Sequence, residues 1–279
     1  MLDKTASAVF DADLSAVRAL AGVVPGPLPL ELNAVKFAAS IRPRKFVIEG
    51  GDDSPVTMPR TAYQVVYPDG TVMIDAGMDK ATHDSFGEGE PYDSEAFAQV
   101  MRALRAARMI VLTHYHADHV GGIVTADDFD ALAVKTIATA ETLSLMMNQP
   151  HRPHLKLPER RAEQFVCVSY GRYYPVAPGL VLIKAPGHSP DMQMIYLRLR
   201  SGREYLHSID AAWNEANIRH VKGKAAPWVK EDVAAVMAQL RWLKRLMTDE
   251  PQLHILVTHD GELLDRMIGD GAVGQRLKV

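Results

Sequence analysis

The amino-acid sequence predicts a mixed α/β fold built from short buried strands and amphipathic helices. Short apolar runs with strand-like composition recur along the chain, for example at 109–112 and 180–184. The segment 230–247 instead places its apolar residues along one face at helical spacing. Of the 279 residues, 47% are hydrophobic, which is enough to bury a sizeable core. We therefore expect strands and helices in one well-packed domain.

The chain divides into an N-terminal extension, residues 1–33, and one domain that spans residues 34–279. The extension carries a short helix around Leu14 to Leu20. The proline-rich stretch 24–29 follows it, and a helix cannot pass through such a cluster.

The first half of the domain reads as a strand-rich segment followed by a helix. Pro68-Asp69-Gly70 is a strong turn signal and predicts a hairpin. A helix follows the polar segment 78–92, with Asp93 or Ser94 as its N-cap. The predicted elements are one or two strands in 34–49, hairpin strands at 62–66 and 71–74, a helix at 94–107 and a strand at 109–112.

The second half alternates between the two kinds of element. The segment 148–164 is rich in Pro, His and Arg, and a loop of this length is typical of a functional lid. The predicted strands are 134–138, 165–168, 180–184, 193–199, 204–209 and 253–257, and the predicted helices are 140–147 and 230–247.

A dense cluster of metal-ligand residue types follows the strand at 109–112. It contains His114, His116, Asp118 and His119, which we expect in a loop at the strand end. Imidazole nitrogen and carboxylate oxygen are donors that zinc and similar ions accept, and a catalytic site keeps a position for water. Four such residues in six positions predict a metal site.

Three further candidates follow other strands, namely His188, Asp210 and His259. If these strand ends meet at one sheet edge, seven ligands gather in one cleft. The predicted division gives His114, His116 and His188 to one ion, Asp118, His119 and His259 to a second, and makes Asp210 the bridge between them. We expect two divalent ions at this site. Zinc is the predicted metal, and iron, manganese and cobalt suit the same donors. Such a pair would generate a bridging hydroxide that attacks a carbonyl. Asp118 and Asp210 are the predicted catalytic residues, with Asp118 carrying the proton to the leaving group.

With these residues, the sequence resembles the metallo-β-lactamase superfamily. The resemblance rests on His114-x-His116-x-Asp118-His119, His188, Asp210 and His259, and covers about residue 34 to the end. It implies an αββα sandwich with the metals at one edge. It also implies that Asp75, at the end of an early strand, supports the site without binding metal.

Within the superfamily, the chain most resembles the N-acyl-homoserine-lactone lactonases. The full ligand set includes Asp210, and the spacings of 69, 22 and 49 residues between His119, His188, Asp210 and His259 fit that group. The resemblance implies an ester substrate, most of all a lactone, and quorum quenching; thioester hydrolysis of the glyoxalase II type and β-lactam hydrolysis are the alternatives. An iron oxidoreductase is disfavoured, because the diiron relatives carry a glutamate where His116 stands.

Substrate contacts are predicted at Trp213, Met146 and Met147. Trp213 stands where the lactonases commonly have a tyrosine, and the methionines are candidates for an apolar wall. His151 lies in the 148–164 segment with Arg152, Arg160 and Arg161. We expect it to be a solvated lid residue; contact with an anionic or polar group of a substrate is the alternative.

The composition excludes several partners. The formal net charge of −3, without a basic tail, argues against nucleic acid, and no apolar stretch is long enough to span a bilayer. The single cysteine, Cys167, cannot form an internal disulfide, and we expect it to be buried. A poor signal sequence and the single thiol predict a cytoplasmic protein, with a homodimer as a possible assembly.

Overall fold

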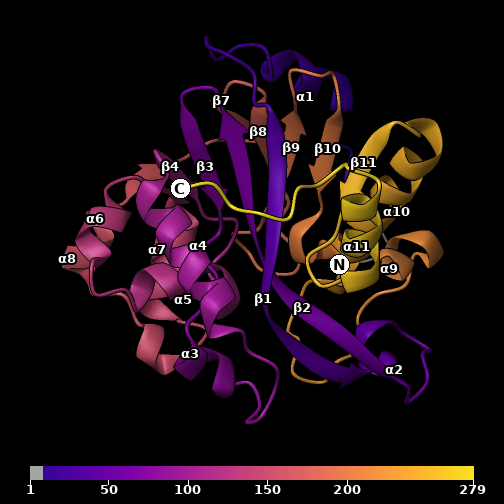
Figure 1. Cartoon of the computed structure of the whole chain (residues 1–279). Helices are drawn as coiled ribbons and strands as arrows, with labels where there is room; N and C mark the ends of the chain where they lie inside the picture. Colours follow the sequence, from indigo (N-terminus) through magenta and orange to yellow (C-terminus); the bar gives the residue numbers. More distant parts are fainter. Residues whose placement is uncertain (1–8) are drawn as a thin grey trace, which may run out of the picture.

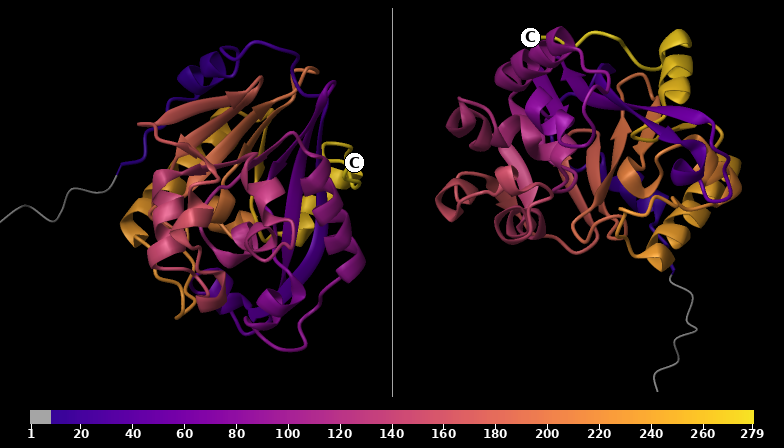
Figure 2. Two further views of the ribbon diagram at one scale, coloured as in Figure 1. Left: turned by 90° about the vertical axis from the view of Figure 1, so that its left-hand side faces the viewer. Right: turned by 90° about the horizontal axis from the view of Figure 1, so that it is seen from below.

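The computed structural model describes residues 9–279 and shows two β-sheets packed face to face. Helices α4, α5 and α7 lie on one side of the sheets, and α9, α10 and α11 on the other (Figure 1). The two further views show the same layered arrangement (Figure 2). The predicted order of helix, sheet, sheet and helix is therefore present.

The first sheet has the strand order β1-β2-β3-β4-β5-β6. Its first three strands are antiparallel, and β3 to β6 run parallel to one another. The turn at Pro68-Asp69-Gly70 joins β2 to β3, which confirms the hairpin. The strands are β1 (Glu31–Pro43), β2 (Pro55–Tyr67), β3 (Gly70–Ile74), β4 (Met109–Val111), β5 (Thr136–Thr139) and β6 (Val166–Val168).

The second sheet has the order β11-β10-β9-β8-β7. Strands β10 and β11 are parallel, whereas β9 is antiparallel to both β8 and β10. Strands β8, β10 and β11 therefore point in one direction and end at the same edge. The strands are β7 (Tyr173–Ala177), β8 (Leu180–Lys184), β9 (Gln193–Arg198), β10 (Glu204–His207) and β11 (Leu253–Leu256).

Two buried hydrophobic clusters hold the layers together. One contains residues from both sheets and from α10, such as Val65, Leu182 and Leu240. The other joins the first sheet to α4–α7, through residues such as Leu104 and Ile123. The helices are α1 (Leu14–Leu20), α2 (Arg44–Val47), α3 (Lys80–Asp84), α4 (Ser94–Ala106), α5 (Ala117–Val124), α6 (Phe129–Ala133), α7 (Ala140–Asn148), α8 (Glu159–Ala162), α9 (Glu215–His220), α10 (Val233–Asp249) and α11 (Gly261–Gly269).

The structure corrects several local predictions. The second half of 34–49 bends into α2 instead of forming a second strand, and β7, α9 and α11 were not foreseen. Cys167 is exposed, because it lies on β6, which has a partner strand on one side only. Strand β1 begins at Glu31, before the expected domain boundary, and α1 packs against β7 and β8.

No helix among residues 9–279 is both long and apolar enough to cross a membrane.

Candidate metal centre

Strand ends from both sheets bring the seven predicted ligands to one edge of the sandwich. His114 and His116 follow β4, whereas His188, Asp210 and His259 follow β8, β10 and β11. Asp118 and His119 are not in the expected loop but in the first turn of α5, which begins at Ala117. Both side chains still reach the strand ends, because His119 lies 3.6 Å from Asp210 and Asp118 lies 3.7 Å from His259.

The first group of potential ligands consists of His114, His116, His188 and Asp210. One ligand atom from each of the four lies within 4.8 Å of the others. His188 Nε2 is 3.1 Å from His116 Nδ1 and 3.3 Å from Asp210 Oδ2. These atoms can hold a single ion between them.

The second group consists of Asp118, His119 and His259, together with the same Asp210. The Nε2 atom of His119 is 3.7 Å from Asp118 Oδ2 and 3.6 Å from Asp210 Oδ1. The Nε2 atom of His259 is 3.7 Å from Asp118 Oδ2 and 3.5 Å from Asp210 Oδ2. Asp210 is thus the carboxylate that both groups share.

The donor atoms fit a divalent metal in spacing and in their lack of other partners. Four ligands placed tetrahedrally about 2.1 Å from a zinc ion lie roughly 3.4 Å from one another. The individual pairs given above, at 3.1 Å to 3.7 Å, are close to this value. His114 Nε2, His119 Nε2 and Asp210 Oδ1 are buried, and none has a hydrogen-bond partner in the described chain. Buried polar atoms normally have hydrogen-bond partners, so three unpartnered donor atoms at one point fit the binding of a cation.

Asp75 supports this centre through hydrogen bonds, where the resemblance places it. Its Oδ2 is 2.7 Å from His119 Nδ1, and its two oxygens accept from the backbone and hydroxyl of Thr113. Burial lowers the pKa of His119, but Asp75 and Asp118 outweigh it and raise this pKa to about 10. An ion bound at Nε2 must therefore displace a proton, as ligation generally requires.

Two further histidines are oriented by contacts that the sequence analysis missed. His188 Nδ1 lies 3.2 Å from Glu231 Oε2, and His259 Nδ1 donates to the carbonyl of Pro59 at 2.9 Å. Each contact leaves the Nε2 atom free to face the centre. Lys224 pairs with Glu231 at 2.8 Å and has a side chain only 1% exposed, so the group is a buried ion pair.

Arg60 is the second functional candidate that sequence reasoning missed. It lies on β2, and its guanidinium contacts the Asp118 carboxylate in a buried ion pair. Burial opposes ionisation of Asp118, but Arg60, with His119 and His259, outweighs it and holds the pKa of this carboxyl well below its usual value. An isolated arginine in a strand carries no pattern that could have identified it.

The backbone is strained next to two of these residues. Asp75 has φ of 61° and Ile209, beside Asp210, has φ of 50°. The left-handed region disfavours a β-branched residue such as isoleucine, and strain of this kind clusters at functional sites. Asp210 itself lies in a short 3₁₀ turn, Ile209–Ala211.

A cavity of about 530 Å³ opens above the centre and is lined by His116, Asp118, His188, Asp210 and His259 among others. Trp213 also lines it, and its Nε1 donates to Asp210 Oδ2 at 3.1 Å. The size is typical of a small-molecule site.

The structure places three other residues differently from the sequence prediction. Met146 and Met147 do not line the cavity, because α7 packs on β5 and β6. Met146 is buried in the hydrophobic cluster there, and Met147 packs against this cluster. We therefore do not assign them to substrate binding. His151 is no solvated lid residue: it lines the cavity, its ring lies 4.2 Å from that of His116, and its Nδ1 accepts from the backbone of Ala117 at 3.1 Å.

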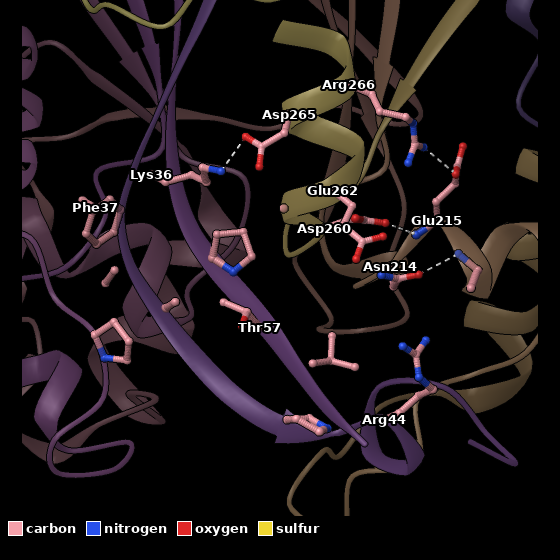
Figure 3. Close-up of a pocket in the computed structure, with 18 of the residues that line it drawn as sticks. Lys36, Phe37, Arg44, Thr57, Asn214, Glu215, Asp260, Glu262, Asp265 and Arg266 are labelled. Carbon is pink, nitrogen blue, oxygen red and sulfur yellow. Dashed lines mark hydrogen bonds and ion pairs between the residues drawn. The ribbon is translucent and has the colours of Figure 1, made fainter. Parts of the chain in front are cut away.

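A second hollow, of about 950 Å³, lies against the other face of the β1–β2 pair. Side chains alternate along β2, so Met58 and Arg60 line the cavity above the centre while Thr57 and Pro59 line this hollow. Figure 3 shows Lys36 directed at Asp265 on the far wall of the hollow.

Comparisons with known proteins agree with this geometry. The family model described as the metallo-beta-lactamase superfamily matches residues 56–259. The N-acyl homoserine lactonase AiiA of Bacillus thuringiensis subsp. kurstaki is 21% identical over 223 residues, covering 74% of this chain and 83% of that protein. An N-acyl homoserine lactonase of Bacillus cereus is 23% identical over 222 residues, with the same coverage of 74% and 83%.

Two solved structures share the fold. One is an N-acyl homoserine lactone hydrolase with the product N-hexanoyl-L-homoserine bound at its catalytic metal centre; the TM-score is 0.67 at 19% identity, covering 86% of this chain and 96% of that one. The other is AidC, a dizinc quorum-quenching lactonase, with a TM-score of 0.60 at 14% identity, covering 86% and 90%. These likenesses confirm the predicted sandwich.

Proposed function

Because the chain belongs to the metallo-β-lactamase superfamily, we propose that it is a dinuclear metal-dependent hydrolase that opens a lactone. The observation that carries the proposal is the shared carboxylate of Asp210, which lies within ligand distance of both groups of donors. The names of the relatives, which are N-acyl homoserine lactonases, support the choice of a lactone over a thioester or a β-lactam.

In the proposed reaction, water adds to the carbonyl carbon of the ring ester. The bond between that carbon and the ring oxygen breaks. One proton of the water goes to the ring oxygen, which leaves as an alcohol, and the other is released to solvent as the carboxylate forms. When bound, a pair of divalent ions lowers the pKa of water and polarises the carbonyl. We assign zinc to both positions, although iron, manganese and cobalt accept the same donors.

The chain's own residues orient the donors and move the proton. Trp213 donates to Asp210 Oδ2, so its N–H holds the shared carboxylate in place instead of reaching for a substrate oxygen. Asp118 lines the cavity, and Arg60 favours its ionised form. A proton taken up by Asp118 would therefore pass readily to the leaving alkoxide.

The cavity also suits an acyl chain. Part of its wall is apolar or aromatic, formed by Phe46, Met58, Phe86, Trp228 and Val229. Apolar walls with a few placed polar groups are typical of pockets that bind small organic ligands.

The test is a hydrolysis panel on protein whose metals have been quantified. Lactones, thioesters and β-lactams are offered at matched concentrations, and we expect about two metal ions per chain with lactones turned over fastest. Substitution His116→Ala should abolish turnover, whereas His220→Ala, at an exposed position that ends α9, should not. Protein with a full complement of metal that opens no lactone would refute the proposal. Faster turnover of a thioester or a β-lactam would show that this compound class, and not a lactone, is the substrate.

A further inference from the structure

The cavity above the metal centre is lined by more basic side chains than carboxylates. Its lining includes two carboxylates, Asp118 and Asp210, and four basic residues, namely Arg42, Arg60, Arg152 and Lys230. Lys230 is exposed. Of the three arginines, Arg42 pairs with Glu90 and Arg60 with Asp118, so these two are neutralised within the protein.

Arg152 has no such partner. Among residues 9–279 it forms no ion pair with a carboxylate, although it is half-buried. Its Nε donates to Ser85 Oγ at 3.1 Å, and its Nη1 donates to the carbonyl of His151 at 3.0 Å. Burial, opposed by Asp118 and assisted by Arg60, lowers the pKa of Arg152, as expected for a cation that lacks a counterion.

The guanidinium of Arg152 is nevertheless held in place. Its central carbon lies 3.8 Å from the ring centroid of Phe86, a stacking contact that fixes its plane. Arg152 directly follows His151, whose ring lies against His116. The planar group is therefore ordered, next to the reaction centre and without a negative partner.

The second hollow shows that ordered basic side chains elsewhere in the described protein do have carboxylate partners. Its basic side chains are matched by carboxylates: Lys36 lies 2.6 Å from Asp265, and Arg266 lies 2.9 Å from Glu215 (Figure 3). An ordered but unpaired arginine sets the cavity above the metal centre apart.

We propose that the lactone or ester that this protein hydrolyses also carries a carboxylate, and that Arg152 binds this group. The inference rests on the proposed function and narrows its substrate class. A planar guanidinium suits a carboxylate because it can donate two parallel hydrogen bonds. An anion at this position would also offset the desolvation of a half-buried cation.

The experiment compares matched acidic and neutral lactones. N-succinyl, N-glutaryl and N-adipoyl homoserine lactone span a range of reach, and each is paired with its terminal primary amide, which has nearly the same shape. We expect kcat/KM for the best acid to exceed that of its amide by about tenfold to a hundredfold, mainly through KM, the range of a charge-assisted hydrogen bond.

Two variants assign the preference to Arg152. In Arg152→Gln the ratio of kcat/KM for the acid to kcat/KM for the amide should fall to near one, and Arg152→Lys should restore part of this ratio. Arg160→Gln removes the same charge from an exposed position on α8 and should leave the ratio unchanged. Calorimetric binding of the ring-opened acid, compared with its amide, should show the same loss in Arg152→Gln.

The outcomes separate this inference from the proposed function. If the wild-type protein opens acids and amides equally well, or if Arg152→Gln keeps the ratio, the carboxylate inference is wrong although lactone hydrolysis stands. If no lactone of either kind is opened, the proposed function fails and the inference fails with it.

Discussion

Substitution of Gly122 by alanine should displace helix α5 and weaken metal binding. A Cβ atom at this position would lie 2.2 Å from the carbonyl oxygen of Ala76. To reach even 3.0 Å, below which real Cβ contacts are essentially never found, the gap must widen by about 0.8 Å. The obstacle is backbone, so no side chain can rotate away.

The magnitude follows from two opposing effects. Every residue of α5 is buried, so the helix has no free space to move into, and overpacking at such a site costs about 3 kcal/mol. Alanine recovers about 1 kcal/mol through its higher helix propensity. The net loss of about 2 kcal/mol corresponds to a fall in Tm of roughly 4–8 °C.

Metal binding should suffer more than folding. Asp118 and His119 lie in the first turn of the same helix, and metal–ligand distances tolerate changes of only about 0.2 Å. We expect Gly122→Ala to hold fewer metal ions per chain, measured by elemental analysis after dialysis, and to melt earlier in calorimetry.

Gly269→Ala is the matched control. Gly269 ends α11, and a Cβ there meets no atom within 4 Å, so Tm and metal content should stay at wild-type values. If Gly122→Ala keeps both its metals and its Tm, the close approach of α5 to Ala76 does not position the ligands, and the reasoning is refuted.

Three further predictions follow from the site and its surroundings. Glu231→Gln removes the charge that orients His188 and should weaken metal affinity about tenfold to a hundredfold in a chelator competition. Glu163→Gln, on the surface, should have no effect. If Glu231→Gln binds metal as tightly as the wild-type protein, Glu231 does not orient His188. Removing metal with a chelator should lower Tm, because a free ion concentration 100 times the Kd stabilises the folded state by about 2.7 kcal/mol. An unchanged melting curve would argue against a metal that only the folded state binds. Burial lowers the pKa of His207 to about 3, below its usual 6.5, so between these pH values the unfolded chain binds one proton more than the folded chain. The free energy of unfolding should therefore fall by up to about 1.4 kcal/mol per pH unit as the pH drops below 6.5. His207→Gln should make this slope shallower, measured by urea unfolding with excess metal.

The candidate ligands could be found from the sequence because each of them stands close after a short apolar strand. His188 and His259 are recognisable without long-range information, since the apolar run and the histidine stand together in the chain. The likeness to the lactonases was visible for the same reason. The predicted loop around Asp118 and His119 was wrong, because nothing in the local sequence distinguishes a helix that begins at Ala117 from a continuing loop.

The substrate wall was harder to predict because it depends on which elements face the cavity. Met146 and Met147 are apolar and close in sequence to the 148–164 segment, but α7 packs on the first sheet and Met146 is buried in the core there. Strand β2, far away in the sequence, supplies Met58 and Arg60 instead. Periodicity indicates which face of an element is buried, but it does not identify the neighbour across a cavity.

The groups that orient the ligands lie beyond any local pattern, and this explains why the site needs the whole fold. Arg60 contacts Asp118 across 58 residues, Glu231 contacts His188 across 43, and the Pro59 carbonyl meets His259 across 200. Pro59 and Arg60 are neighbours on β2, so one strand fixes ligands that come from both sheets. Arg60 contacts Asp118 and the Pro59 carbonyl contacts His259, and both partners belong to the second group of donors. A shift of β2 relative to the strand ends would therefore alter this group first. The fixed position of the β1–β2 pair is therefore a condition for the proposed dinuclear arrangement.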